Sequence, residues 1–134
     1  MATADEVWLP LRWRDLDYFG HVYHGEFLTL LDEARSRWFG TALRLAQPES
    51  YVVARLEIDY VSPLSIEDGG VRVGFTLEAV GTTSLTVRET MCGGDGRQVA
   101  RSRTVVVLWD RAQSRARPLA DDERARAAAL VDRP

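Results

Sequence analysis

Hydrophobic residues recur at helical spacing in one stretch near the start of the chain. Four of them follow one another in steps of four, three and four residues, which is the period of one helical face. They are Phe27, Leu31, Ala34 and Trp38. Other apolar residues spread around the rest of the circumference, so the pattern predicts a buried helix from about Gly25 to Phe39. Gly40 is placed to end this helix.

Most of the remaining chain alternates apolar and polar residues with period two, which is the pattern of half-buried strands. It predicts one strand before the helix, interrupted at Pro10, and four strands after it. Their ranges are Val7–Trp13, Tyr51–Tyr60, Val71–Val80, Leu85–Met91 and Val99–Trp109. A connector ending at Gln47-Pro48-Glu49 follows the helix, and glycine-rich turns join the later strands, mostly as hairpins.

This order of elements indicates an α+β fold. A helix too apolar to be exposed, followed by antiparallel strands, is best accommodated when the sheet curls around the helix. No repeat or linker divides the sequence, so we expect a single domain over residues 1–134, with a core at about 7–110 and a tail at 111–134. Within that tail, Asp121–Val131 either forms a short helix or stays loose.

Composition narrows the functional classes. The 134 residues are 46% hydrophobic, which is enough for a core, and the net charge of −3 gives no electrostatic attraction to nucleic acid. The single cysteine, Cys92, excludes an internal disulfide and a multi-cysteine zinc site. The N-terminus lacks a basic region followed by an apolar run, and no run approaches about 18 apolar residues. We therefore expect a cytoplasmic protein without a membrane span.

The loop before the predicted helix concentrates polar side chains. It carries two aspartates and two histidines, namely Asp15, Asp17, His21 and His24. The first turn of a helix has unpaired N–H groups and the positive end of the helix dipole. A carboxylate and imidazoles at that place suit chemistry on a carbonyl group, because N–H donors stabilise the oxyanion that forms there.

Simpler roles stay open for these residues. Asp17 could cap a turn or the helix start. Asp15 and Asp17 lack a third ligand at a clear spacing, so we expect no metal. His21 is interpreted as a loop hydrogen-bonding residue. Glu33 and Arg35 are interpreted as charges on the helix, with Glu33 facing solvent, a substrate channel or a subunit contact.

The same stretch resembles the signature of a known family. The residues that carry the resemblance are Asp17, Gly20-His21-Val22-Tyr23-His24, Phe27-Leu28 and Glu33-Ala34-Arg35, with Ile58–Leu64 and Asp68 later in the chain. They are similar to the 4-hydroxybenzoyl-CoA thioesterase family of the hot-dog-fold superfamily. The triplet Val22-Tyr23-His24 resembles its Tol-Pal-associated, short-chain acyl-CoA branch. The similarity covers about residues 8–110, but Trp13 and Gly25-Glu26 differ from the usual residues of that branch, so the acyl group is not predicted.

The resemblance implies a hot-dog domain, in which a curled antiparallel sheet wraps around one long central helix. It also implies hydrolysis of acyl-CoA thioesters by a homodimer or a dimer of dimers, without metal or cofactor. By position, Asp17 matches the family's catalytic aspartate, and His24 matches the helix-start residue whose backbone N–H polarises the thioester carbonyl. In the Tol-Pal-associated branch the histidine itself counts with the active site. Tyr23 and Gly25 are then expected to contact the substrate.

Two functions are compatible with this sequence. The first is a thioester hydrolase that acts on an acyl-CoA, an aromatic acyl-CoA or a carrier-protein thioester, with Asp17 as nucleophile or general base. The alternative is a noncatalytic hot-dog module that binds acyl-CoA or serves as an assembly subunit. The Asp17 carboxylate favours the hydrolase, because a binding module has no need of it. A dehydratase fits less well, because the paired acid and histidine that such hot-dog enzymes carry on the helix loop are not visible.

Overall fold

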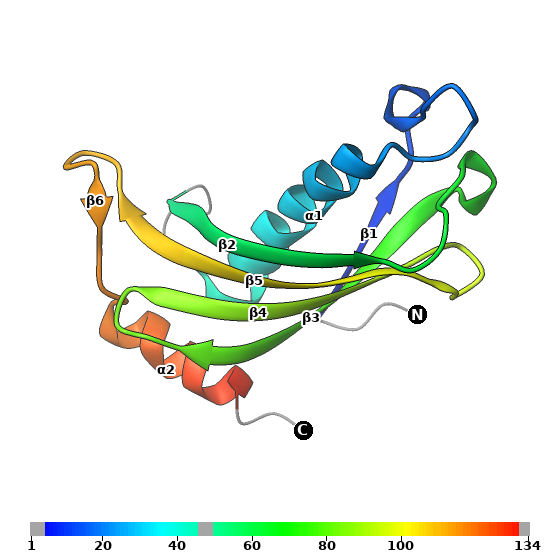
Figure 1. Cartoon of the computed structure of the whole chain (residues 1–134). Coiled ribbons are helices and arrows are strands. Elements are labelled where there is room, and N and C mark those ends of the chain that lie inside the picture. Colours follow the sequence, from blue (N-terminus) through cyan, green and yellow to red (C-terminus); the bar gives the residue numbers. More distant parts are fainter. Residues whose placement is uncertain (1–4, 46–49, 132–134) are drawn as a thin grey trace.

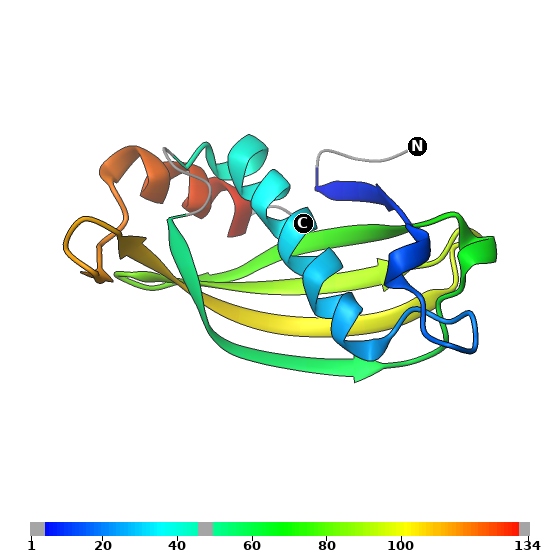
Figure 2. The same ribbon diagram turned by 90° about the horizontal axis from the view of Figure 1, so that it is seen from above.

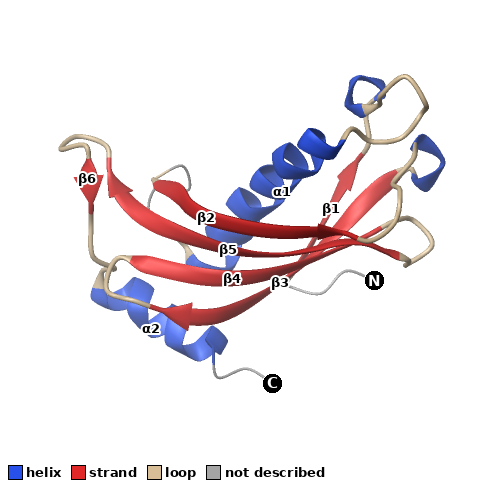
Figure 3. Cartoon of the chain, viewed as in Figure 1, coloured by secondary structure: helices blue, strands red, loops and turns tan. Residues whose placement is uncertain are grey.

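The computed structural model describes residues 5–45 and 50–131. In this part of the chain the helices are α1 (His24–Trp38) and α2 (Asp121–Val131), and strands and short helical turns make up the other elements (Figure 3). The strands are β1 (Glu6–Pro10), β2 (Tyr51–Tyr60), β3 (Gly70–Val80), β4 (Ser84–Cys92), β5 (Gln98–Asp110) and β6 (Arg115–Ala116). The short turns are η1 (Trp13–Asp15), η2 (Phe39–Leu43) and η3 (Ile66–Asp68). The predicted connector at Gln47-Pro48-Glu49 lies outside the described residues.

The strands form one antiparallel sheet that curls around α1. Its order is β1-β3-β4-β5-β2, and β6 adds to β5 through the pair Trp109 and Ala116. Figures 1 and 2 show α1 running across one face of this curved sheet. The predicted α+β fold, a sheet wrapped around one long helix, is therefore confirmed. The order leaves β1 and β2 at the two edges of the main sheet.

The core lies between α1 and the inner face of the sheet. All four residues of the predicted apolar helix face are buried. The indole of Trp38 stacks on the ring of Phe75 from β3, with centroids 4.9 Å apart. Alternate residues of β3 and β4 are buried against the helix, which is the period-two pattern expected for a sheet with one covered face. Each fully buried apolar side chain of this size contributes about 1.5–3 kcal/mol.

The helix does not end at Gly40 as the sequence suggested. It continues directly into the π-helical turn η2, and the chain leaves that turn at Arg44, which has a positive φ of 49°. Phe39 and Leu43 are both buried, so extending the helix by one wider turn places two more apolar side chains in the core. Gly40 is therefore an interior residue of the turn, and the expected helix stop is wrong.

The first strand is shorter than predicted. β1 ends at Pro10, and Trp13 belongs to the turn η1 instead of the strand. Proline has no N–H to continue the ladder, and the Asp15 carboxylate accepts a hydrogen bond from the backbone N–H of Arg12 at 2.8 Å, which turns the chain. β1 lies at the sheet edge, as expected for a strand containing proline.

The C-terminal segment forms a helix, which was one of its two expected outcomes. Ala127 and Leu130 of α2 are buried, and the helix contacts β3 and η2. Its start is held by Glu123, which accepts hydrogen bonds from the Ala120 N–H at 2.9 Å and from the Arg117 guanidinium at 2.8 Å and 3.0 Å. The hydrogen bond and charge of Arg117 lower the pKa of Glu123.

Candidate active site

The start of α1 presents two backbone donors that no other part of the described chain uses. Tyr23, in extended geometry, precedes the first helical residue His24, and the Glu26 N–H donates to the Tyr23 carbonyl at 2.8 Å. Within residues 5–45 and 50–131, the N–H groups of His24 and Gly25 donate to no acceptor. They point out of the N-terminal end of a 15-residue helix, where the helix dipole favours negative charge.

Asp17 closes the loop that leads to this helix. Its Oδ1 accepts hydrogen bonds from the backbone N–H of Phe19 at 2.8 Å and of His21 at 3.1 Å. Its own N–H donates to the His21 carbonyl at 2.7 Å, and Gly20 between them has a positive φ of 81°. The turn-capping role considered for Asp17 is thus present. Only Oδ1 is used in it, and Oδ2 accepts no hydrogen bond from the described residues.

Asp15 is engaged in a different way. Its side chain is fully buried, and it pairs with the Arg12 guanidinium at 3.1 Å as well as with the Arg12 backbone N–H. The hydrogen bond that the Arg12 guanidinium donates to Asp15 raises the pKa of Arg12. The Asp15 carbonyl accepts the N–H of Tyr23 at 3.2 Å, so this residue supports the approach to the helix. Of the two carboxylates, Asp17 is therefore the one with an oxygen atom that accepts no hydrogen bond from the described residues.

The loop is attached to the sheet through the segment after β2. The Val22 N–H donates to the Leu64 carbonyl at 2.7 Å, and His21 forms an isolated bridge with Ser65. Figure 1 shows the loop and η3 at the same end of the molecule. This attachment gives the loop a defined place next to the helix start, although no hydrogen bond joins Asp17 to His24 among the described residues. His21 contributes its backbone to the loop, and its side chain is exposed.

The segment after β2 is itself clamped to the turn between β4 and β5. Asp68 accepts hydrogen bonds from the backbone N–H of Ser65 at 3.0 Å and of Gly94 at 3.1 Å. Burial alone would raise the pKa of Asp68, but these bonds and the nearby Arg97 guanidinium lower it. Arg97 also donates to the Pro63 carbonyl at 2.8 Å. A Cβ at Gly94 would overlap the Asp68 carbonyl, so glycine is required at this close approach.

Aromatic rings surround the helix start. The ring of Tyr23 lies against Gly25, where an added Cβ would come within 2.8 Å of Tyr23 Cε1, and it also contacts the His24 ring at 4.3 Å. Tyr60, at the end of β2, donates its hydroxyl hydrogen to the His24 carbonyl at 2.9 Å. Its ring meets those of His24 and Phe27 edge to face. The structure thus gathers the predicted residues Tyr23, His24 and Gly25.

Sequence reasoning did not assign a role to Tyr60. Tyr60 was noted only as the last residue of the predicted strand Tyr51–Tyr60 and within Ile58–Leu64, where the resemblance lies. Its strand position was available as a signal, because Tyr60 follows Leu56 and Ile58 at steps of two and therefore faces α1. Burial, together with the nearby Tyr23, raises the pKa of the Tyr60 hydroxyl, which therefore stays protonated and able to donate at neutral pH.

A second polar group that the sequence did not reveal lies deeper, between α1 and the sheet. Arg35 was expected on the helix surface, but its side chain is fully buried, and the expectation is wrong. Its guanidinium pairs with Glu89 of β4 at 2.7 Å. Glu89 also accepts hydrogen bonds from Ser102 and Thr104 of β5, each at 2.8 Å. The sequence signal for this pair was Glu89, an acidic residue at an inward position of the β4 alternation, because a buried carboxylate requires a partner.

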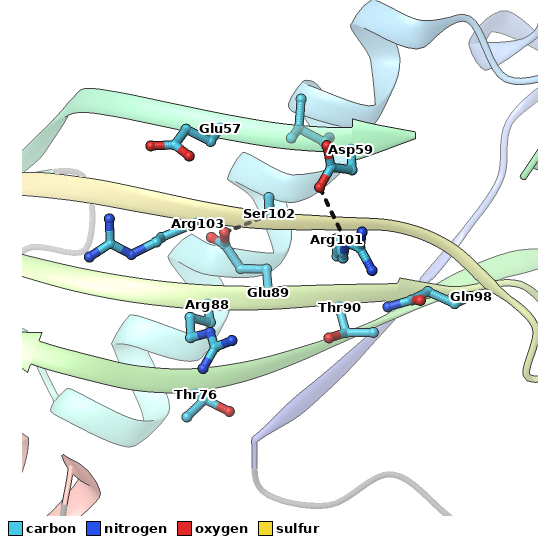
Figure 4. A pocket seen from close by; sticks show the side chains of 11 residues that line it. Glu57, Asp59, Thr76, Arg88, Glu89, Thr90, Gln98, Arg101, Ser102 and Arg103 are labelled. Atoms are coloured by element: carbon cyan, nitrogen blue, oxygen red, sulfur yellow. Dashed lines mark hydrogen bonds and ion pairs between the residues drawn. The ribbon is translucent and has the colours of Figure 1, made fainter. Parts of the chain in front are cut away.

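A hollow of about 630 Å³ lies on the outer face of the sheet, away from α1 (Figure 4). Its lining residues are Glu57, Ile58, Asp59, Thr76, Arg88, Glu89, Thr90, Gln98, Arg101, Ser102 and Arg103. The charged groups pair across strands: Arg101 meets Asp59 at 3.2 Å, and Arg103 meets Glu78 at 2.6 Å. The hollow offers none of the free helix-start donors, so we place the candidate site at the start of α1.

Neither a metal cluster nor a membrane-spanning helix is present in the described residues. No three side chains of histidine, cysteine, aspartate or glutamate gather closely enough there to hold a metal ion. No helix within residues 5–45 and 50–131 is both long and apolar enough to cross a membrane. Cys92 is a half-buried free thiol.

Comparison with known proteins places the chain in a family. No curated protein matches it. A thioesterase from Thermus thermophilus, crystallised with coenzyme A and zinc, is 32% identical, with 98% of this chain and 96% of that one covered and a TM-score of 0.81. A predicted thioesterase from Bacillus stearothermophilus is 26% identical over 96% of this chain and 97% of that one, with a TM-score of 0.81.

Another similar structure is the protein SAV2348 from Staphylococcus aureus in complex with CoA. It is 14% identical over 97% of this chain and 85% of that one, and its TM-score of 0.83 shows the same fold. The family model described as the thioesterase-like superfamily matches residues 11–127, which include the loop, α1, the strands β2 to β6 and most of α2. The chain therefore belongs to the thioesterase-like superfamily and has the hot-dog fold.

Proposed function

We propose that the protein hydrolyses the thioester bond of an acyl-CoA. The observation that carries the proposal is the pair of unused N–H donors of His24 and Gly25 at the start of α1. Attack on a thioester places negative charge on the carbonyl oxygen, and preorganised backbone donors stabilise that charge without reorganisation. The dipole of a 15-residue helix adds to the same effect.

Asp17 supplies the reactive carboxylate in this proposal. Acting as a general base, it takes a proton from water while the water oxygen bonds to the thioester carbon. Acting as a nucleophile, it bonds to that carbon itself, and water then hydrolyses the resulting anhydride. In both routes the carbon–sulfur bond breaks and CoA leaves as a thiolate. This thiolate is stable enough near neutral pH that the site needs no strong general acid.

The environment of Asp17 suits that role. The loop hydrogen bonds from Phe19 and His21 hold Oδ1 in place, and Oδ2 is the oxygen left to face water or substrate. Asp15, two residues earlier, is buried and paired with Arg12, so it does not compete for the role. Tyr23 and Gly25 form the walls that the substrate carbonyl meets, with the Tyr23 ring against the Gly25 backbone.

The relatives support CoA as the thiol part of the substrate. The Thermus thermophilus thioesterase, 32% identical to this chain, was crystallised with coenzyme A. The Val22-Tyr23-His24 triplet resembles the Tol-Pal-associated branch, and we propose this branch as the nearest functional group. A carrier-protein thioester is a close variant, because the chemistry at the carbonyl is the same.

We propose that the protein acts as a homodimer or a dimer of dimers. β2 is an edge strand of the main sheet that exposes Val52 and Val53, and an unpaired apolar edge favours pairing with another chain. Around the site, Trp13, Tyr18 and Phe19 expose 85%, 96% and 79% of their surfaces. Aromatic residues this exposed suit contact with a second copy or with an acyl group.

The test is a screen for thiol release. The purified protein is incubated with acyl-CoAs of increasing chain length, with aromatic acyl-CoAs and with a carrier-protein thioester, and free thiol is measured. Turnover of at least one class, abolished by Asp17→Asn, is the expected result. Binding of acyl-CoA without turnover of any of these thioesters would contradict the hydrolase proposal and favour the noncatalytic binding module.

A further inference from the structure

We infer that Tyr60 is a positioning residue that strengthens and aims the Gly25 N–H through the peptide group between His24 and Gly25. The inference rests on the proposed function and deepens it. Tyr60 is the last residue of β2, and Figure 2 shows this end of β2 beside the start of α1. Its hydroxyl donates a hydrogen bond to the His24 carbonyl oxygen at 2.9 Å.

The acceptor of this bond and the free donor belong to the same peptide unit. The His24 carbonyl and the Gly25 N–H are the two ends of one planar amide. A donor on the carbonyl oxygen draws electron density from the amide nitrogen, and this makes the N–H a stronger donor. Because the Gly25 N–H has no acceptor within the described residues, its strengthened dipole is available to a ligand.

The geometry also fixes the direction of that N–H. The His24 carbonyl is held from the side of the sheet by Tyr60, while the rings of Tyr60, His24 and Phe27 pack edge to face. The Tyr23 ring lies against Gly25, where an added Cβ would come within 2.8 Å of Tyr23 Cε1. Both tyrosines therefore contact the 24–25 peptide unit or its Gly25 end, and its rotation is restricted.

The strand contains a matched control. Tyr51, at the other end of β2, also joins the strand to α1, through a hydrogen bond of 2.9 Å between its hydroxyl and that of Ser36. Ser36 lies in the last turn of α1, far from the helix start. Tyr51→Phe and Tyr60→Phe each remove one hydroxyl from a helix-to-strand contact, but only Tyr60→Phe alters the 24–25 peptide.

The first measurement is kinetic. In Tyr60→Phe we expect kcat to fall with KM nearly unchanged. Because the Gly25 donor is kept, the fall should be about tenfold and not the 10²–10³ typical of removing an oxyanion donor. Tyr51→Phe should keep kcat within about twofold, since its hydroxyl touches no part of the donor peptide. Incorporation of 3-fluorotyrosine at position 60, which makes the hydroxyl a stronger donor, should restore or exceed the wild-type kcat at pH 7.

The second measurement needs no turnover. The chain has two histidines, followed by Val22 and Gly25, so carbonyl-¹³C histidine with ¹⁵N glycine labels a single His–Gly peptide. In a correlation spectrum of amide and carbonyl this peptide gives one cross peak. Tyr60→Phe should move both the carbonyl carbon and the Gly25 amide proton of that peak, whereas Tyr51→Phe should leave it in place.

The outcomes are separable. An unchanged cross peak in Tyr60→Phe, or a moved peak with unchanged kcat, overturns the inference. If the wild-type protein hydrolyses no thioester, the proposed function fails, and the inference is decided by titration with a ketone analogue of an acyl-CoA. That analogue should then move the His24–Gly25 peak further in the wild type than in Tyr60→Phe, and equal movement overturns the inference. Matching circular dichroism and oligomer size are required of every variant.

Discussion

The guanidinium of Arg35 and the carboxylate of Glu89 meet at 2.7 Å with neither side chain exposed to solvent. The pair joins the last turn of α1 to the middle of β4, and Thr104 of β5 donates to Glu89. Leaving one charge of such a pair without its partner is far more costly than removing both, because the remaining charge stays desolvated. This relationship gives a prediction about stability that is independent of function.

We expect Glu89→Gln to reduce the free energy of unfolding by about 3–5 kcal/mol, because it leaves Arg35 buried without its main counter-charge. Replacing both residues with methionine should recover much of this loss. Glu33→Gln, at the exposed Glu33–Arg37 pair on the same helix, is the control and should cost under about 1 kcal/mol. Urea unfolding measures all of these, and a double variant no more stable than Glu89→Gln would contradict the interpretation.

Asp17→Asn should remove most turnover and leave acyl-CoA binding nearly intact. The amide oxygen can still accept the N–H bonds of Phe19 and His21, so the loop is kept while the negative charge needed for attack or water activation is lost. Kinetics and calorimetric binding of CoA measure the two effects separately.

Asp15→Asn is the comparison for this prediction. Because Asp15 is buried against Arg12, its replacement should lower the melting temperature while kcat per folded molecule stays close to wild type. An inactive Asp15 variant beside a nearly normal Asp17 variant would invert the assignment of the two carboxylates.

His24→Ala and His24→Pro separate the backbone of this residue from its imidazole. Alanine keeps the N–H, so appreciable activity should remain. Proline removes the N–H, which should cost about 10²–10³ in kcat. The fold should tolerate proline, because His24 is the first helical residue and Tyr23 before it is already extended, with φ −62° and ψ 139°.

Circular dichroism and oligomer size must match the wild type for this comparison to hold. Equal and severe losses in the alanine and proline variants would assign the work to the imidazole, and the backbone role of His24 would then be dropped.

Light scattering should report a species of at least two chains of 15.1 kDa at micromolar concentration. Val53→Arg should shift it toward monomer, because Val53 is exposed on the edge strand β2, and a charge there would be desolvated in a strand-to-strand contact. The same exposure means that the variant chain itself should fold normally. A monodisperse wild-type species of 15.1 kDa would contradict the proposed homodimer or dimer of dimers.

The clamp at Asp68 should make stability fall at acid pH. The pKa of Asp68 is lower in the folded protein than in the unfolded chain. Its contribution is therefore present above the unfolded value of about 3.9 and is lost as pH falls below it toward the folded value. The difference in melting temperature between wild type and Asp68→Asn should then shrink from pH 7 to pH 2.

Asp59→Asn serves as the control, because among the described residues the partner of Asp59 is Arg101, in an exposed ion pair on the outer face of the sheet. A gap between wild type and Asp68→Asn that stayed constant across this range would show that the clamp acts without its charge.

The sequence by itself determined the elements and their order. The helical spacing of Phe27, Leu31, Ala34 and Trp38 placed α1, and period-two alternation placed β2 to β5 within a few residues, because these periods follow from local backbone geometry. It also brought Tyr23, His24 and Gly25 to one helix start, since neighbours in sequence are neighbours at a helix terminus.

The tertiary structure decided what depends on contacts between distant residues. Arg35 is interpreted as a helix charge from the sequence alone, because its partner Glu89 is 54 positions later and contacts it only in the folded chain. Tyr60 likewise hydrogen-bonds to His24, which is 36 positions away in the sequence. Gly40 is an interior residue of the extended helix because burial of Phe39 and Leu43 outweighs its local tendency to end a helix. Local propensities amount to roughly 1 kcal/mol, and burial of large apolar side chains exceeds them. For that reason the helix end and the surroundings of the candidate site required the folded chain.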